Sequence, residues 1–184
     1  MNHIDISSVL RKTLACDLYS NLVTRPTGAA VRGQIEQLLS ETDDRGLTVI
    51  DFSQVSMIDF SCADEVVAKL LIRYVSDDAP REAYFLFRGV GEDHRDAIET
   101  VLERHGLALA LELADGIEVM GVLSDEERKV WDASYRTGRA AAEDLASQID
   151  ADLDDALRAL DALCRRRLMM RIDDEYVVVG SSRG

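Results

Sequence analysis

The chain has 184 residues, of which 47% are hydrophobic and 30% charged, a balance typical of a folded protein rather than a disordered or membrane-spanning one. Its formal net charge is −14, and an acidic surface repels the phosphates of nucleic acids and anionic lipids. The three cysteines, Cys16, Cys62 and Cys164, are far apart and predict neither a disulfide framework nor a zinc site.

The sequence also lacks the features of an exported or membrane protein. No uninterrupted apolar run approaches the length of a membrane span, and the polar first residues do not resemble a signal peptide. We therefore expect a cytoplasmic protein with reduced thiols, no cofactor or metal, and no contact with a membrane.

The first part of the chain alternates between strand and helix patterns. The expected pairs are a strand at 19–25 with a helix at 28–40, a strand at 47–52 with a helix opening at Ser61, and a strand at 83–87 with a helix at 93–105. Three such units imply a mainly parallel sheet with helical crossovers, the α/β class.

An Asp-Gly turn joins two further apolar runs, at 107–113 and 117–122, and predicts a hairpin that closes a first domain of residues 1–122. The opening residues 3–18 fit a strand or a helix equally, so both assignments stay open.

Residues 123–184 change to a helical period. Helices are expected at 125–136, 140–149 and 153–166, followed by a hairpin of 168–172 and 176–179. This is the element order of a winged helix, so we expect a small winged-helix-like α+β domain.

Residues 49–65, which read VIDFSQVSMIDFSCADE, resemble STAS domains, in which an apolar strand and a short turn lead to a serine at a helix start. The match to a STAS-like branch with a Ser-Phe-Ala-Asp-Glu helix start is closer, and it extends to residues 23–28 and Arg32. The resemblance to anti-sigma-factor antagonists implies a non-enzymatic domain that binds a GHKL-type serine kinase or ATPase, which phosphorylates that serine. Ser61 occupies the acceptor position, with Phe60 and Cys62 where the family has serine and glycine.

Ser61 also has a structural interpretation. Ser61 and Asp64 have the spacing of a capping box, so the hydroxyl would accept a free backbone N–H of the first helical turn. A phosphate would benefit from the same N–H groups, but nearby acids would repel it. We favour capping over a phosphorylation switch and keep both.

Residues Thr24, Arg25 and Thr27 lie where a strand ends and a helix begins. They could contact an anion or a partner, or form a loop made rigid by Pro26 with Thr27 as the helix N-cap. Together with Asp59 and Asp64 they are the candidate partner-binding residues. His94 is expected at a solvated helix start.

Residues Arg158, Arg165, Arg166 and Arg171 could grip a DNA backbone if the C-terminal domain reads DNA. The acids Asp152, Asp154 and Asp155 oppose this, because they stand where the recognition helix would approach phosphate. We expect a signalling protein that binds a protein partner and can form a homodimer; the alternative is a transcription regulator that binds DNA. No pattern of catalytic residues supports an enzyme.

Overall fold

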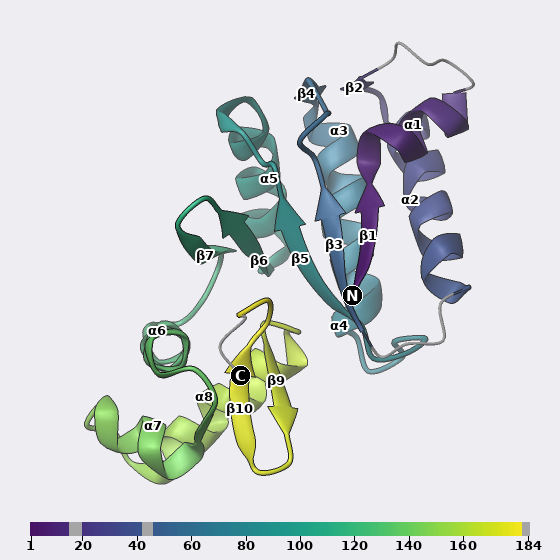
Figure 1. The fold of residues 1–184 in the computed structure, drawn as a ribbon. Coiled ribbons are helices and arrows are strands. Elements are labelled where there is room, and N and C mark those ends of the chain that lie inside the picture. Colours follow the sequence, from purple (N-terminus) through teal and green to yellow (C-terminus); the bar gives the residue numbers. More distant parts are fainter. Residues whose placement is uncertain (15–19, 42–45, 182–184) are drawn as a thin grey trace.

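The computed structural model describes residues 1–14, 20–41 and 46–181. It is a mixed α/β structure built on one five-stranded sheet, with helices behind the sheet and a smaller group of helices and strands at its lower left in Figure 1. In spatial order the strands are β1 (Asn2–Asp5), β3 (Leu47–Asp51), β5 (Tyr84–Arg88), β6 (Ala108–Leu113) and β7 (Gly116–Gly121).

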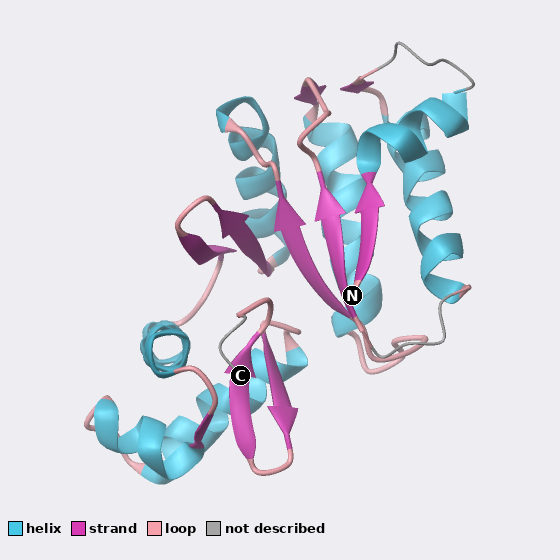
Figure 2. Ribbon diagram, in the orientation of Figure 1, coloured by secondary structure: helices cyan, strands magenta, loops and turns pink. Residues whose placement is uncertain are grey.

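The pairing of these strands confirms the expected parallel sheet. β1, β3, β5 and β6 pair in parallel, and β6 pairs with β7 in the antiparallel hairpin predicted from the Asp-Gly turn. The opening residues, which the sequence left ambiguous, form a strand and then a helix. The two-residue strands β2 (Asn21–Leu22) and β4 (Met57–Ile58) form a small parallel pair above the sheet (Figure 2).

The helices of this part cover one face of the sheet. They are α1 (Ile6–Leu14), α2 (Arg25–Ser40), α3 (Phe60–Ala63), the π-helix η1 (Asp64–Lys69), α4 (Leu70–Val75) and α5 (Glu92–His105). The chain runs without a break from α3 through η1 to α4. α5 ends as predicted, with Gly106 in the left-handed conformation that glycine accepts most easily (φ 63°).

The central strands are buried on both faces, as parallel strands usually are. Ile50 and Phe87 belong to the core under the helices. Val49 and Leu86, one residue earlier on the same two strands, point to the other face and pack with Val179. The chain therefore returns to the sheet at its C-terminal end and covers part of the face that lacks helices.

The remaining elements form a second apolar core. They are α6 (Asp125–Thr137), β8 (Ala140–Ala141), α7 (Ala142–Gln148), α8 (Leu153–Arg165), β9 (Met169–Ile172) and β10 (Glu175–Val178). β10 pairs antiparallel with β8 and with β9. Trp131 and Tyr135 stack in this core with ring centroids 5.3 Å apart, and Ala108 of β6 also belongs to it.

Several expected boundaries were wrong by a few residues. Of the strand expected at 19–25, the described residues form only Asn21–Leu22, and residue 19 lies outside the described residues. α2 begins at Arg25 rather than near residue 28, and the next helix begins at Phe60 rather than at Ser61. Among the described residues, no helix has the length and apolarity needed to cross a bilayer.

Candidate functional site

The candidate site lies above the sheet, where β2 leads into α2 and β4 leads into α3. Thr24, the residue before α2, has φ 74° and ψ 138°, a conformation that residues other than glycine rarely adopt. Such a conformation costs about 1–3 kcal/mol and persists only where other contacts impose it. The structure supplies those contacts from the neighbouring helix start.

Asp59 is the main contact between the two segments. Its Oδ1 accepts a hydrogen bond from the N–H of Cys62 (2.8 Å), and its Oδ2 accepts one from the N–H of Thr24 (2.9 Å). Burial raises the pKa of this carboxyl, but the hydrogen bonds from Thr24 and Cys62 outweigh it and hold the pKa below its ordinary value. Asp59 therefore caps α3 as a carboxylate and fixes Thr24 at the same time.

This geometry corrects both expected helix caps. Asp59, not Ser61, is the N-cap of α3, and Ser61 lies half-buried in the first turn. Within the described part of the chain, the Ser61 hydroxyl has no hydrogen-bond partner. Thr27 is also inside a helix rather than at its cap, and its hydroxyl lies 3.1 Å from that of Thr24.

The two helices approach each other closely at Gly28. A Cβ added there would lie 2.9 Å from the Cα of Cys62 and 3.0 Å from the Cβ of Glu65. Cys62 itself donates its S–H to the carbonyl oxygen of Thr24 (3.0 Å). Burial, followed by the nearby Asp59 carboxylate, raises the pKa of the Cys62 thiol to about 12, so the group is a neutral donor and a poor nucleophile.

A charged network lies beside this contact. One guanidinium nitrogen of Arg25 lies 2.7 Å from Asp64 Oδ2 and 2.8 Å from Glu65 Oε1. His105, at the end of α5, places Nε2 2.8 Å from Asp64 Oδ1. Glu65 also pairs with Arg32 and Lys69. The network thus joins α2, the π-helix and α5.

Both acids of the network are almost completely buried, yet charged. Burial raises the pKa of Asp64, but hydrogen bonds from Arg25 and His105 lower it further, so the result is a depressed pKa. Glu65 follows the same pattern, with Lys69 and Arg25 opposing burial. Asp64 and Glu65 open the π-helix, a rare form that recurs at functional sites. In this protein the acids face inward, so Asp64 holds the site together instead of contacting a partner directly.

The exposed residues of the site lie over a layer of buried, paired acids. Thr24 and Arg25 are exposed, whereas the carboxylates beneath them are already paired. The described residues contain no group of His, Cys, Asp and Glu side chains able to hold a metal ion. Of the sequence candidates, the structure brings together Thr24, Arg25 and Thr27 with Asp59, Asp64 and Ser61.

The four arginines considered for DNA are separate from this site and do not form one surface, since Arg165 and Arg171 line one pocket to which Arg158 and Arg166 do not belong. Arg166 donates to the carbonyl oxygens of Gly106 and Val122, which lie in the sheet part of the molecule. Arg158 pairs with Asp155 within α8, and Arg171 pairs with Asp174 across its hairpin. Arg165 is exposed at the end of α8.

The candidate site residues chosen from the sequence did not include four members of the network, Arg32, Glu65, Lys69 and His105. His105 is the last residue of the helix expected at 93–105, and no sequence signal links it to an acid 41 residues away. No protein-family model matches the chain, and no curated protein sequence matches it significantly.

Proposed function

We propose that the chain is a cytoplasmic, non-enzymatic regulatory protein of two domains. Residues 1–122 are a STAS-like domain that binds a protein partner of the GHKL-type ATPase or kinase class, and residues 123–184 are a winged-helix-like domain that adds a second interface. The observation that carries this proposal is the double hydrogen bond of Asp59, which fixes two exposed segments into one rigid surface.

The proposed docking surface consists of Thr24, Arg25, Met57, Phe60 and Ser61. Met57, the first residue of β4, has 45% of its surface exposed, so a large apolar side chain lies in solvent there. The guanidinium of Arg104 lies 5.7 Å from the centre of the half-exposed Phe60 ring. Apolar and aromatic anchors beside an arginine are the groups that contribute most of the affinity in protein interfaces.

Phosphorylation of Ser61 would act on this surface through Asp59. The added phosphate carries nearly two negative charges and would stand two residues from the carboxylate that fixes Thr24. Repulsion between the two groups weakens the Asp59 hydrogen bonds, which releases the strained Thr24 backbone. In this mechanism the modified protein loses its partner because the surface loses its shape.

Protein contact is also the better proposal for the C-terminal domain. A DNA-binding role would need Arg158, Arg165, Arg166 and Arg171 to face phosphates together. Arg166 instead donates to carbonyl oxygens within the molecule, and Arg158 does not line the pocket that Arg165 and Arg171 share. The acids Asp154 and Asp155 lie in the first turn of α8, where a recognition helix would approach the bases.

The proposal is tested by coexpressing the chain with a GHKL-type ATPase. We expect a complex on size-exclusion chromatography. Met57→Ala should raise the Kd of this complex about tenfold. Ile172→Ala is the matched control, because Ile172 is exposed to a similar extent (41%) but lies in β9. Ser61→Glu should dissociate the complex, and mass spectrometry should find phosphate on Ser61 when ATP is present. A complex equally stable with Met57→Ala and Ser61→Glu would contradict the proposed surface.

A further inference from the structure

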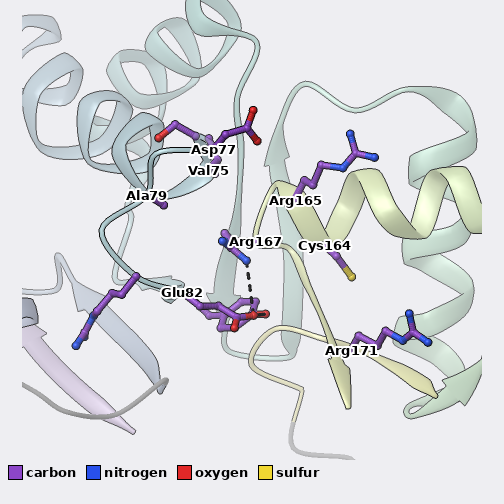
Figure 3. Close-up of a pocket in the computed structure, with 11 residues that line it drawn as sticks. Val75, Asp77, Ala79, Glu82, Cys164, Arg165, Arg167 and Arg171 are labelled. Carbon is purple, nitrogen blue, oxygen red and sulfur yellow. Dashed lines mark hydrogen bonds and ion pairs between the residues drawn. The ribbon is translucent and has the colours of Figure 1, made fainter. Parts of the chain in front are cut away.

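A cleft of about 440 Å³ opens between the sheet part of the molecule and the C-terminal elements. One wall is the connection from α4 to β5, with Asp77, Ala79 and Glu82; the other is formed by the end of α8 and by β9, with Arg165 and Arg171 (Figure 3). Arg167 reaches across from the second wall to Glu82. The volume falls within the range of small-molecule sites, roughly 300–1,000 Å³.

The charge of this cleft is opposite to that of the whole protein. Four arginines line it, Arg81, Arg165, Arg167 and Arg171, against two acids, Asp77 and Glu82. The chain as a whole has 35 acidic and 21 basic residues. A concave surface concentrates the field of its charges, so the cleft, which we call the arginine cleft, attracts anions that the rest of the surface repels.

Arg167 is the fixed member of the group. It has a left-handed backbone (φ 60°), and its Nε donates to the carbonyl oxygen of Tyr74 (3.2 Å). Its guanidinium also lies 3.6 Å from Glu82 Oε1 and 5.8 Å from the centre of the Tyr84 ring. These contacts join the two walls and hold one guanidinium edge inside the cleft in advance of any ligand.

The other two arginines of this wall are available for a ligand. Arg171 lies over the Tyr176 ring at 5.8 Å and pairs with Asp174, whose side chain is 97% exposed. An ion pair this exposed contributes little free energy, so a more highly charged anion can replace Asp174. Arg165 is exposed and makes no ion pair within the described ranges.

We propose that the arginine cleft binds a small organic phosphate carrying several negative charges. Guanidinium groups recognise phosphate oxygens through paired hydrogen bonds, and three of them lie on one wall, at the end of α8, in the connection that follows it and in β9. Duplex DNA fits this site poorly, because the cleft is concave and the chain as a whole carries a net charge of −14. Since both walls supply arginines, a bound anion also favours the arrangement in which the two parts of the molecule are docked.

Isothermal titration calorimetry of the full chain with inorganic pyrophosphate, at constant ionic strength, tests the proposal. We expect saturable binding at one site. In the double variant Arg165→Ala/Arg171→Ala the affinity for pyrophosphate should fall about tenfold for each arginine removed. Both side chains are exposed, so this variant keeps the fold, which circular dichroism verifies. Arg158→Ala is the matched control: its side chain is 75% exposed and pairs only within α8, so binding should be unchanged.

Three outcomes would overturn the proposal. One is that pyrophosphate does not bind the unmodified protein, and another is that the double variant binds it as tightly as Arg158→Ala does. The third comes from a parallel titration with a short DNA duplex. Duplex binding that is tighter than pyrophosphate binding and is lost in the double variant would assign the cleft to nucleic acid instead.

Discussion

Replacing Gly28 by alanine tests whether the close contact between α2 and the start of α3 constrains the site. In an open helix, changing glycine to alanine stabilises the protein by about 1 kcal/mol, because alanine loses less backbone entropy on folding. At Gly28 the new Cβ would stand 2.9 Å from the Cα of Cys62, a backbone atom that cannot rotate away. Overpacking of this kind costs about 1–3 kcal/mol.

The same helix provides a matched control at Gly33, where an added Cβ meets nothing within 4 Å. We expect Gly33→Ala to raise the free energy of unfolding by about 1 kcal/mol. Gly28→Ala should lower it by up to about 2 kcal/mol, the overpacking cost less the helix gain. The two variants should therefore differ by about 1–3 kcal/mol and lie on either side of the unmodified protein.

Urea unfolding followed by circular dichroism measures both changes, provided that the slope of the free energy against urea stays constant. The reasoning fails if Gly28→Ala is as stable as Gly33→Ala. In that case the contact would yield without cost, and the rigidity assigned to the Thr24 loop would have no basis at Gly28.

Three further predictions concern the cap, the buried acids and the thiol. Asp59→Ala should lower the free energy of unfolding in urea by at least about 2 kcal/mol. Asp152→Ala should lower it by only about 1 kcal/mol, because Asp152 caps α8 with a single hydrogen bond. Equal losses in the two variants would refute the linking role of Asp59. The depressed pKa values of Asp64 and Glu65 stabilise the fold above the pKa values of the unfolded chain, about 4. The free energy of unfolding should therefore fall as the pH drops from about 5 towards 3, and less steeply in Asp64→Asn, whereas identical pH profiles would exclude this acid as a cause. Cys62, with its pKa raised to about 12, should resist iodoacetamide at pH 8 in the native protein and react in urea, as peptide mass spectrometry can measure; rapid labelling of the native thiol would contradict its burial.

The alternation of strands and helices was readable from the sequence because it rests on local patterns. The runs at 47–52 and 83–87 are apolar because both faces of the central strands are buried, and Gly106 marks a helix end because the backbone there needs a positive φ. The C-terminal hairpin followed from an acidic turn between two apolar runs. Each of these signals lies within a few residues of the feature that it predicts.

The errors occurred where distant contacts decide the outcome. Asp59 and Ser61 are both good N-cap residues, and local preference does not separate them. Asp59 prevails because its second oxygen meets the N–H of Thr24, 35 residues away. His94 was expected in solvent but is only 5% exposed. Its Nδ1 accepts a hydrogen bond from the N–H of Gly91, and its Nε2 is hydrogen-bonded to the carbonyl oxygen of Val55. The distant partners, Thr24 for Asp59 and Val55 for His94, could not be identified from spacing.

The β6–β7 hairpin belongs to both apolar cores, since Leu109 packs under the helices while Ala108 packs with the C-terminal elements. Neither core can melt without removing support from the other, so heating should give one calorimetric transition for the whole chain. A fragment ending at residue 122 would leave Val49, Tyr84 and Leu86 uncovered and would tend to aggregate. The C-terminal elements therefore also keep apolar residues of the sheet out of contact with solvent.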